Sequence, residues 1–253
     1  MGKVIAVTNQ KGGAGKTTTA TALAAALQLK GFSVLFIDTD PQCNSTDTYQ
    51  AAIIDTATLY DVLFEGEPAA AAIQHTLMGD ILPSDRLMRE AEQHLTKVGR
   101  EYALKNAITP LKDDYDYIII DTPLNLDIMI INALTFADIA VIPLTADRYA
   151  LQGLAQIIET VSGVKQYTNS SLKVAGLLFT QHDNRLILSK EISESLAPIA
   201  KQLDTTVFDT SIRRAVAVKE AQTNRESLFS YAPDSTAAQD YMRFTEELLE
   251  RGI

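Results

Sequence analysis

Five short apolar runs, rich in β-branched residues, recur along the chain and alternate with longer segments of helical periodicity. Runs that are apolar at nearly every position are typical of parallel strands covered on both faces. The pattern predicts strands over residues 3–9, 33–39, 116–122, 138–145 and 173–180. It predicts helices over residues 16–30, 149–166, 187–202 and 235–250. We therefore expect an α/β fold, with a mostly parallel sheet flanked by helices on both faces.

The segment from residue 43 to residue 115 differs from the rest because it contains no clean apolar run. Its alanine-rich and amphipathic pieces, residues 68–78 and 87–107, favour helices, so we expect an all-helical connection between two strands. The chain of 253 residues is 46% apolar, which is enough to bury one large core. We expect a single domain over residues 1–253.

The net charge of −10 argues against a protein that binds polyanions at all times. Cys43 is the only cysteine, which excludes a disulfide framework and a cysteine-ligated cluster within one chain. The histidines, His75, His94 and His182, lack the spacing of metal ligands. No apolar stretch is long enough to span a bilayer and no charged leader precedes the first strand, so we expect a cytoplasmic protein without membrane attachment.

A glycine-rich segment, KGGAGKTTT, spans residues 11–19 and joins the first predicted strand to the first predicted helix. A phosphate at a helix N-terminus needs converging backbone N–H groups, and glycines let the backbone approach without Cβ clashes. Lys16 would bring a positive charge to the β- and γ-phosphates of a nucleotide, and the Thr17 hydroxyl could ligate Mg²⁺. The residues expected to bind the nucleotide here are Lys11, Gly12, Gly13, Ala14, Gly15, Lys16, Thr17 and Thr18.

This segment departs from the standard phosphate-loop pattern, G-x-x-x-x-G-K-[ST], in one respect. Gln10 stands where the first glycine belongs, and Lys11 adds a second lysine before Lys16. The alternative interpretation is a glycine turn followed by a basic helix start. The strand before the segment and the helix after it argue against that alternative.

Two of the predicted strands end in aspartates, Asp38 and Asp121, and Asp40 follows shortly after the first of them. A carboxylate that ends a buried apolar run loses its hydration unless a cation faces it. We expect Asp121 to hold Mg²⁺ through a water molecule, with Asp38 and Thr17 also at the metal. Asp40 is better placed to orient the attacking water or to accept its proton. Ordinary strand-end or turn aspartates are the alternative.

The pattern KGG-x-GKTT is the deviant Walker A motif, and with it the chain resembles the ParA proteins of the ParA/MinD superfamily of P-loop ATPases. Further blocks resemble the same family along nearly the whole chain. They are FIDTDPQCNST (36–46), YDYIIIDTP (115–123), VIPLTADRYALQGL (141–154), VFDTSIRRAVAVKEA (207–221) and DSTAAQDY (234–241).

The resemblance implies ATP binding and Mg²⁺-dependent hydrolysis, with Lys16 and Asp40 as catalytic residues. It implies an ATP-driven homodimer in which Lys11 also acts in catalysis by reaching the phosphates of the other subunit. It places Ile212 and Arg213 at the base. It further implies non-specific DNA binding in the ATP state, a ParB-like centromere-binding partner, and a role in plasmid or chromosome partition at the nucleoid.

The chain departs from the family around residues 124–127 and at residues 213 and 215, where Ile-Pro-Arg-Asn is usual and Ile-Arg-Arg-Ala is found. DNA binding needs Lys or Arg at phosphates, and the window 185–225 holds a small excess of basic residues in an acidic chain. Arg213 and Arg214 are the first candidates for that contact.

Three other functions fit parts of the pattern. A MinD-like membrane-cycling ATPase would carry basic residues on its C-terminal helix, whereas residues 235–250 are acidic. A ligase similar to dethiobiotin synthetase would generally lack Lys11, and a relative of nitrogenase reductase would need paired cysteines. Positioning of another cargo by a ParA-like ATPase stays open.

Overall fold

The computed structural model describes residues 2–124, 128–145, 150–182 and 196–252. Their centre is a seven-stranded sheet in the order β3-β4-β2-β5-β1-β6-β7. The strands are β1 (Lys3–Val7), β2 (Val34–Asp38), β3 (Gln74–Thr76), β4 (Gly79–Leu82), β5 (Tyr117–Asp121), β6 (Ile139–Thr145) and β7 (Lys173–Thr180). Neighbouring strands in this sheet are parallel, except for the antiparallel pair of β3 and β4 at one edge.

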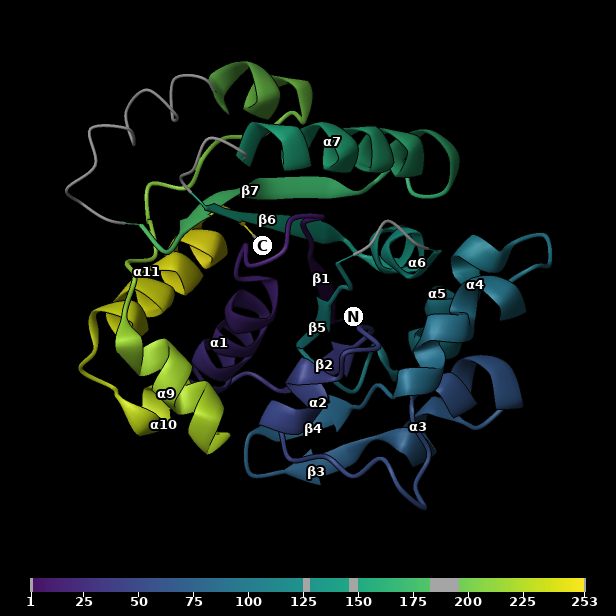
Figure 1. The fold of residues 1–253 in the computed structure, drawn as a ribbon. Helices are drawn as coiled ribbons and strands as arrows, with labels where there is room; N and C mark the ends of the chain where they lie inside the picture. Colours follow the sequence, from purple (N-terminus) through teal and green to yellow (C-terminus); the bar gives the residue numbers. More distant parts are fainter. Residues whose placement is uncertain (1, 125–127, 146–149, 183–195, 253) are drawn as a thin grey trace.

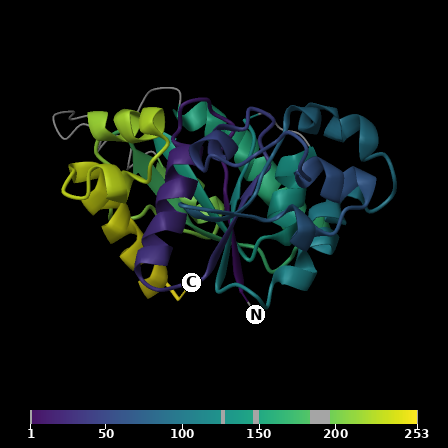
Figure 2. The ribbon, with the colours of Figure 1, turned by 90° about the horizontal axis from the view of Figure 1, so that it is seen from below.

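Helices cover both faces of the sheet (Figure 1). One layer contains α1 (Lys16–Leu29), α9 (Val216–Asn224), α10 (Leu228–Tyr231) and α11 (Thr236–Glu250). The other contains α4 (Ala91–His94), α5 (Ala103–Ile108), α6 (Ile128–Phe136) and α7 (Ala150–Tyr167). The short helices α2 (Asn44–Thr48) and α3 (Ala69–Ala72) lie between β2 and the edge hairpin in sequence. In Figure 2 the purple α1 and the yellow α11 lie together on one side of the sheet.

Side chains along β1 alternate between the two faces of the sheet, so the strand contributes to two hydrophobic cores. Side chains of successive strand residues point to opposite faces. Ile5 and Val7 pack with the layer of α1 and α11, whereas Val4 and Ala6 pack with the layer of α6 and α7. Because both faces are covered, the strand is apolar at every position between its ends, which is the pattern that made it predictable.

The predicted fold class is confirmed, and each of the five predicted strands is present. The helices expected over residues 16–30, 149–166 and 235–250 correspond to α1, α7 and α11. Of the helix expected over residues 187–202, only residues 196–202 lie within the described part, and they are helical. Within the described residues, no helix is long and apolar enough to cross a membrane.

The prediction for residues 43–115 was wrong, because this segment contributes the hairpin of β3 and β4 to the sheet. β4 pairs in parallel with β2, with Leu35 opposite Asp80 and Ile37 opposite Leu82. β3 is the edge strand and β4 is its neighbour, and both are short and partly exposed, so no apolar run marks them in the sequence. Gly79 makes the turn possible with a φ of 114°, a conformation that side chains rarely adopt.

The parallel strands bring their carboxyl ends to one edge of the sheet. Val7 and Asp38 are both in register with Asp121, and Thr145 is in register with Thr180. The glycine-rich segment leaves β1 at this edge, which is where open α/β sheets bind their ligands.

Candidate active site

Two residues at the end of β7 donate hydrogen bonds to backbone carbonyls of the glycine-rich loop between β1 and α1. Thr180 Oγ1 donates a hydrogen bond of 2.8 Å to the Ala14 carbonyl, and Gln181 Nε2 donates one of 2.7 Å to the Gly13 carbonyl. Gly15 has a φ of 82°, and a Cβ added there would lie 3.4 Å from Thr180 Oγ1. With its carbonyls bound from β7, the loop keeps its N–H groups available at the N-terminus of α1, which suits an anion.

Lys16 begins α1 inside this loop and is only 8% exposed. Burial lowers the pKa of its ammonium, while the negative charges of Asp121 and Asp40 oppose the shift. A buried cation at a helix N-terminus is stabilised by an anionic ligand beside it. The loop is therefore suited to hold phosphate.

Lys11, the second lysine of the motif, has contacts with the ends of β1 and β6. Its backbone N–H donates to Asn9 Oδ1 at 3.0 Å, and its Nζ donates to Thr145 Oγ1 at 3.1 Å, at the end of β6. Asn9 in turn donates to the Pro143 carbonyl at 2.6 Å. The two lysines of the motif thus have separate surroundings within one chain.

Asp121, at the end of β5, has one carboxylate oxygen in use and one without a partner. Oδ2 accepts a hydrogen bond of 2.7 Å from Ser45 Oγ. Oδ1 is buried and has no hydrogen-bond partner among the described residues. Burial raises the pKa of Asp121, and hydrogen bonds from Ser45 and Thr17 oppose the shift. A buried, unpartnered carboxylate oxygen close to the Thr17 hydroxyl fits a hard divalent cation such as Mg²⁺.

Asp38 has a different environment from the one expected for a metal ligand. Its Oδ2 accepts hydrogen bonds from the Thr46 N–H at 2.9 Å and from Thr46 Oγ1 at 2.7 Å, and its Oδ1 accepts one from the Asp40 N–H at 3.0 Å. Burial, followed by the charge of Asp121, raises the pKa of its carboxyl group. Both oxygens of Asp38 hold the turn after β2, and this turn carries Asp40.

Asp40 is 9% exposed and accepts a hydrogen bond of 2.9 Å at Oδ1 from the Gln42 N–H. Burial raises its pKa, against the opposing effects of that N–H and of the Lys16 charge. No set of three or more His, Cys, Asp and Glu side chains among the described residues is arranged to hold a metal. A cation at Asp121 would accordingly need further ligands from a bound molecule.

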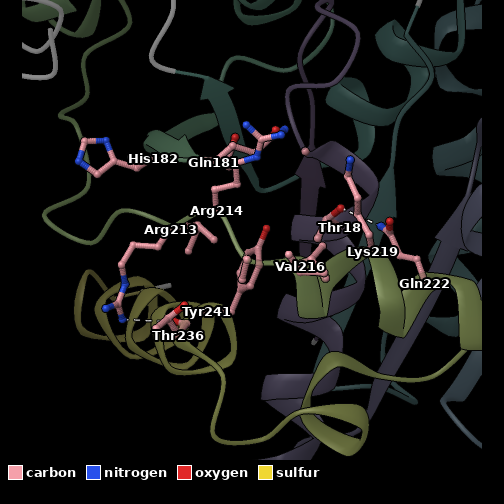
Figure 3. A pocket seen from close by; sticks show the side chains of 15 residues that line it. Thr18, Gln181, His182, Arg213, Arg214, Val216, Lys219, Gln222, Thr236 and Tyr241 are labelled. Carbon is pink, nitrogen blue, oxygen red and sulfur yellow. Dashed lines mark hydrogen bonds between the residues drawn. The ribbon is translucent and has the colours of Figure 1, made fainter. Parts of the chain in front are cut away.

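A cavity of about 670 Å³ opens beside the loop, between Gly15 and Thr18 on one side and α9 and α11 on the other (Figure 3). Residues 212–216 form its wall, and Ile212 is fixed there by backbone hydrogen bonds with Phe179 and His182. Gln222 of α9 donates to Thr18 Oγ1 at 3.0 Å. The cavity is large enough for a nucleoside next to the phosphate loop.

Arg213 borders this cavity, but its guanidinium is bound elsewhere, which the sequence did not indicate. Nε and Nη2 donate to the two carboxylate oxygens of Asp240 at 2.8 and 2.7 Å, and the Arg213 N–H donates to the same carboxylate at 3.0 Å. Asp240 is 2% exposed and also accepts from Arg243. We expected Arg213 to contact a base; its side chain instead fastens the cavity wall to α11.

The structure thus brings together most of the predicted site residues and adds others. The residues of the site that the sequence did not indicate are Asn9, Ser45, Thr180, Gln181 and Gln222. For Thr180 and Gln181 a signal existed, since they follow a parallel strand at its carboxyl end. For the rest, the contacts join segments far apart in the sequence.

Comparison with known proteins gives one family and full-length relatives. A family described as an AAA domain matches residues 2–174. The chain is 38% identical to the sporulation initiation inhibitor protein Soj of Bacillus subtilis, over 100% of both chains. It is 34% identical to the chromosome partitioning protein ParA of Myxococcus xanthus, over 99% of this chain and 89% of that one.

Among solved structures, a cobyrinic acid a,c-diamide synthase from Mycobacterium smegmatis with bound ADP and magnesium has a TM-score of 0.86. It is 33% identical, over 100% of this chain and 96% of that chain. The likeness extends over the whole sheet and its helices.

Proposed function

Because the chain belongs to the Soj/ParA family of partitioning ATPases, we propose that it binds ATP with Mg²⁺, hydrolyses it, and uses this cycle as a dimerisation switch. The observation that carries the proposal is the buried, unpartnered Asp121 Oδ1 at the edge of a phosphate loop braced from β7. Full-length relatives named for chromosome partitioning support partition as the biological role.

We assign each residue of the site a role according to its surroundings. The N–H groups of residues 12–18 would surround the phosphates, and Lys16 would neutralise their charge. Thr17 and Asp121 would hold Mg²⁺, which when bound stabilises the charge on the transferring phosphoryl group. Asp38, with both oxygens in protein hydrogen bonds, would keep the turn after β2 in place.

Asp40 would orient the attacking water and accept its proton. Its position on the turn gives it a carboxylate near Lys16 but outside the Ser45–Asp121 pair. Burial raises its pKa, which makes it a better base than an exposed aspartate.

Lys11 would act across the dimer. In the single chain its ammonium donates a hydrogen bond to Thr145 Oγ1 at the end of β6, whereas Lys16 is buried at the start of α1. In the ATP state Lys11 would contact the nucleotide of the second subunit. We further propose non-specific DNA binding by this dimer, a ParB-like partner that stimulates hydrolysis, and a cytoplasmic, nucleoid-associated location.

The test is calorimetry of ATP with Mg²⁺, together with phosphate release in the absence of any small-molecule acceptor. We expect the wild type to bind ATP and hydrolyse it slowly, and Lys16→Ala to lose binding. Unchanged ATP affinity in Lys16→Ala would remove the phosphate-loop assignment. A strict requirement for an organic acceptor would instead favour a synthase, the activity in the name of the mycobacterial neighbour.

A further inference from the structure

The cavity beside the phosphate loop is basic, although the chain as a whole is acidic. Among the described residues that line it, Arg213, Arg214 and Lys219 are basic and none is Asp or Glu, in a chain of net charge −10. The Arg213 guanidinium is bound to Asp240. The other two basic residues that line the cavity are Arg214 and, on α9, Lys219.

Lys219 is placed over the N-terminus of α1 by a contact of its own helix. Gln222 of α9 donates to Thr18 Oγ1 at 3.0 Å, which fixes this face of α9 against the start of α1. Residues three positions apart lie on the same face of a helix, so Lys219 stands beside Gln222 on that face. Figure 3 shows the Lys219 side chain extending from α9 alongside the N-terminal end of α1.

The ammonium of Lys219 has no protein partner within the described part of the chain. No ion pair or hydrogen bond there uses its Nζ, and the residue is exposed. An ordinary surface lysine would satisfy this description, but an ordinary surface lysine does not line a nucleotide-sized cavity without acidic neighbours. The position therefore suits a cation that meets its partner only when an anionic ligand enters.

We propose that Lys219 binds the nucleotide phosphates from the α9 side, nearest the α-phosphate. The proposal rests on the proposed nucleotide binding and adds a residue to it. In a phosphate loop the lysine and hydroxyl of the motif serve the β- and γ-phosphates and Mg²⁺, while the N–H groups at the start of the helix also reach the α-phosphate. Lys219 lines the cavity together with Thr18, and it lies one helical turn from Gln222, which binds Thr18. Because ATP and ADP both carry an α-phosphate, Lys219 would support the binding of both.

The test compares Lys219→Met with Lys219→Arg and with Lys97→Met, an exposed lysine outside the cavity that gives the same change of charge. Calorimetry with ATP and with ADP, each with Mg²⁺ and at two salt concentrations, supplies the affinities. We expect Lys219→Met to weaken both nucleotides by about ten-fold and to reduce the salt dependence of binding. Lys219→Arg should keep most of the affinity, and Lys97→Met all of it.

Equal ATP and ADP affinities in Lys219→Met and the wild type would overturn the inference and leave the proposed function standing. A weakening for ATP alone would also overturn it, because it would place the lysine at the γ-phosphate. A variant that binds nucleotide normally but loses DNA binding would assign Lys219 to DNA instead. Failure of the wild type to bind ATP would contradict the proposed function itself.

Discussion

Ser45 Oγ donates a hydrogen bond of 2.7 Å to Asp121 Oδ2, while the buried Oδ1 of the same carboxylate has no partner in the described part of the chain. Ser45 belongs to α2, which follows the turn of Asp38 and Asp40, so the contact joins the ends of β2 and β5. It fixes the orientation of the carboxylate before any ligand arrives. An oriented, unpartnered oxygen is what a metal site needs, because buried polar atoms otherwise find a partner.

Asp121→Asn should abolish the effect of Mg²⁺ on ATP affinity and lower turnover by roughly 10²-fold or more, since an amide is a poor replacement for a charged ligand. Ser45→Ala is the matched control: it frees Oδ2 but keeps the charge, so its effect should be much smaller. The measurement is ATP titration with and without Mg²⁺. An Asp121→Asn variant that still responds fully to Mg²⁺ would exclude Asp121 as a metal ligand.

Asp40→Ala should bind ATP normally, hydrolyse it roughly 10²–10⁴-fold more slowly, and accumulate as a dimer. In its proposed role the Asp40 carboxylate acts on the attacking water, so its removal should change ground-state binding little. Asp47→Ala serves as the control because Asp47 is exposed and pairs with Arg225 on the surface. Sedimentation with ATP checks the outcome, and an Asp40→Ala protein that stays monomeric while hydrolysing normally would contradict the assigned role.

Asp240→Asn should lower the free energy of unfolding by about 2 kcal/mol at pH 7. It replaces with a neutral amide the buried carboxylate that pairs with Arg213 and Arg243. Burial alone would raise the pKa of Asp240, but the hydrogen bonds from Arg213 outweigh it and hold the pKa below its ordinary value. The contribution is therefore complete above about pH 4 and is lost as the pH falls further.

Denaturant unfolding at pH 7 and at pH 3 measures this difference. Asp47→Asn, which breaks the exposed pair with Arg225, should cost less than about 1 kcal/mol. If the two variants were equally stable at pH 7, Asp240 would not be the anchor of the cavity wall.

Arg214→Ala should weaken ATP-dependent DNA binding and reduce its log–log salt slope by about one per chain. Arg213→Ala should leave that slope unchanged, because its guanidinium is already bound to Asp240. Residues 185–195 of the basic window lie outside the described residues. Filter binding decides between the two arginines. Absence of ATP-dependent binding at about 50 mM salt would move the protein from nucleoid-based partition to another ParA-like positioning role.

The parts of this fold that could be predicted are those marked by a local sequence pattern. β1, β2, β5, β6 and β7 are buried on both faces, so each is an apolar run, and the phosphate loop follows directly after the first of them. β4 escaped prediction because its first residues, Gly79 and Asp80, are polar or turn-forming and only Ile81 and Leu82 are buried. In a strand of four residues next to the edge strand β3, the hydrophobic pattern does not distinguish a strand from a loop.

The same distinction applies to the site. Lys16, Thr17 and Asp121 were predictable because a phosphate loop and a strand end place them by sequence alone. The contact of Gln181 with Gly13 and that of Arg213 with Asp240 join positions with no local relation. Which oxygen of a carboxylate is already in use, as in Asp38 and Asp121, can be known only from the packed structure.

We propose that ATP joins two copies of this chain through Lys11, whose ammonium donates a hydrogen bond to Thr145 in the single chain. Sedimentation of the wild type and of Lys11→Ala with Mg²⁺ and ATP is the test, with calorimetry to compare their ATP affinities. We expect a wild-type dimer, and a Lys11→Ala protein that binds ATP but sediments as a monomer. A Lys11→Ala protein that dimerises with ATP as well as the wild type would contradict it.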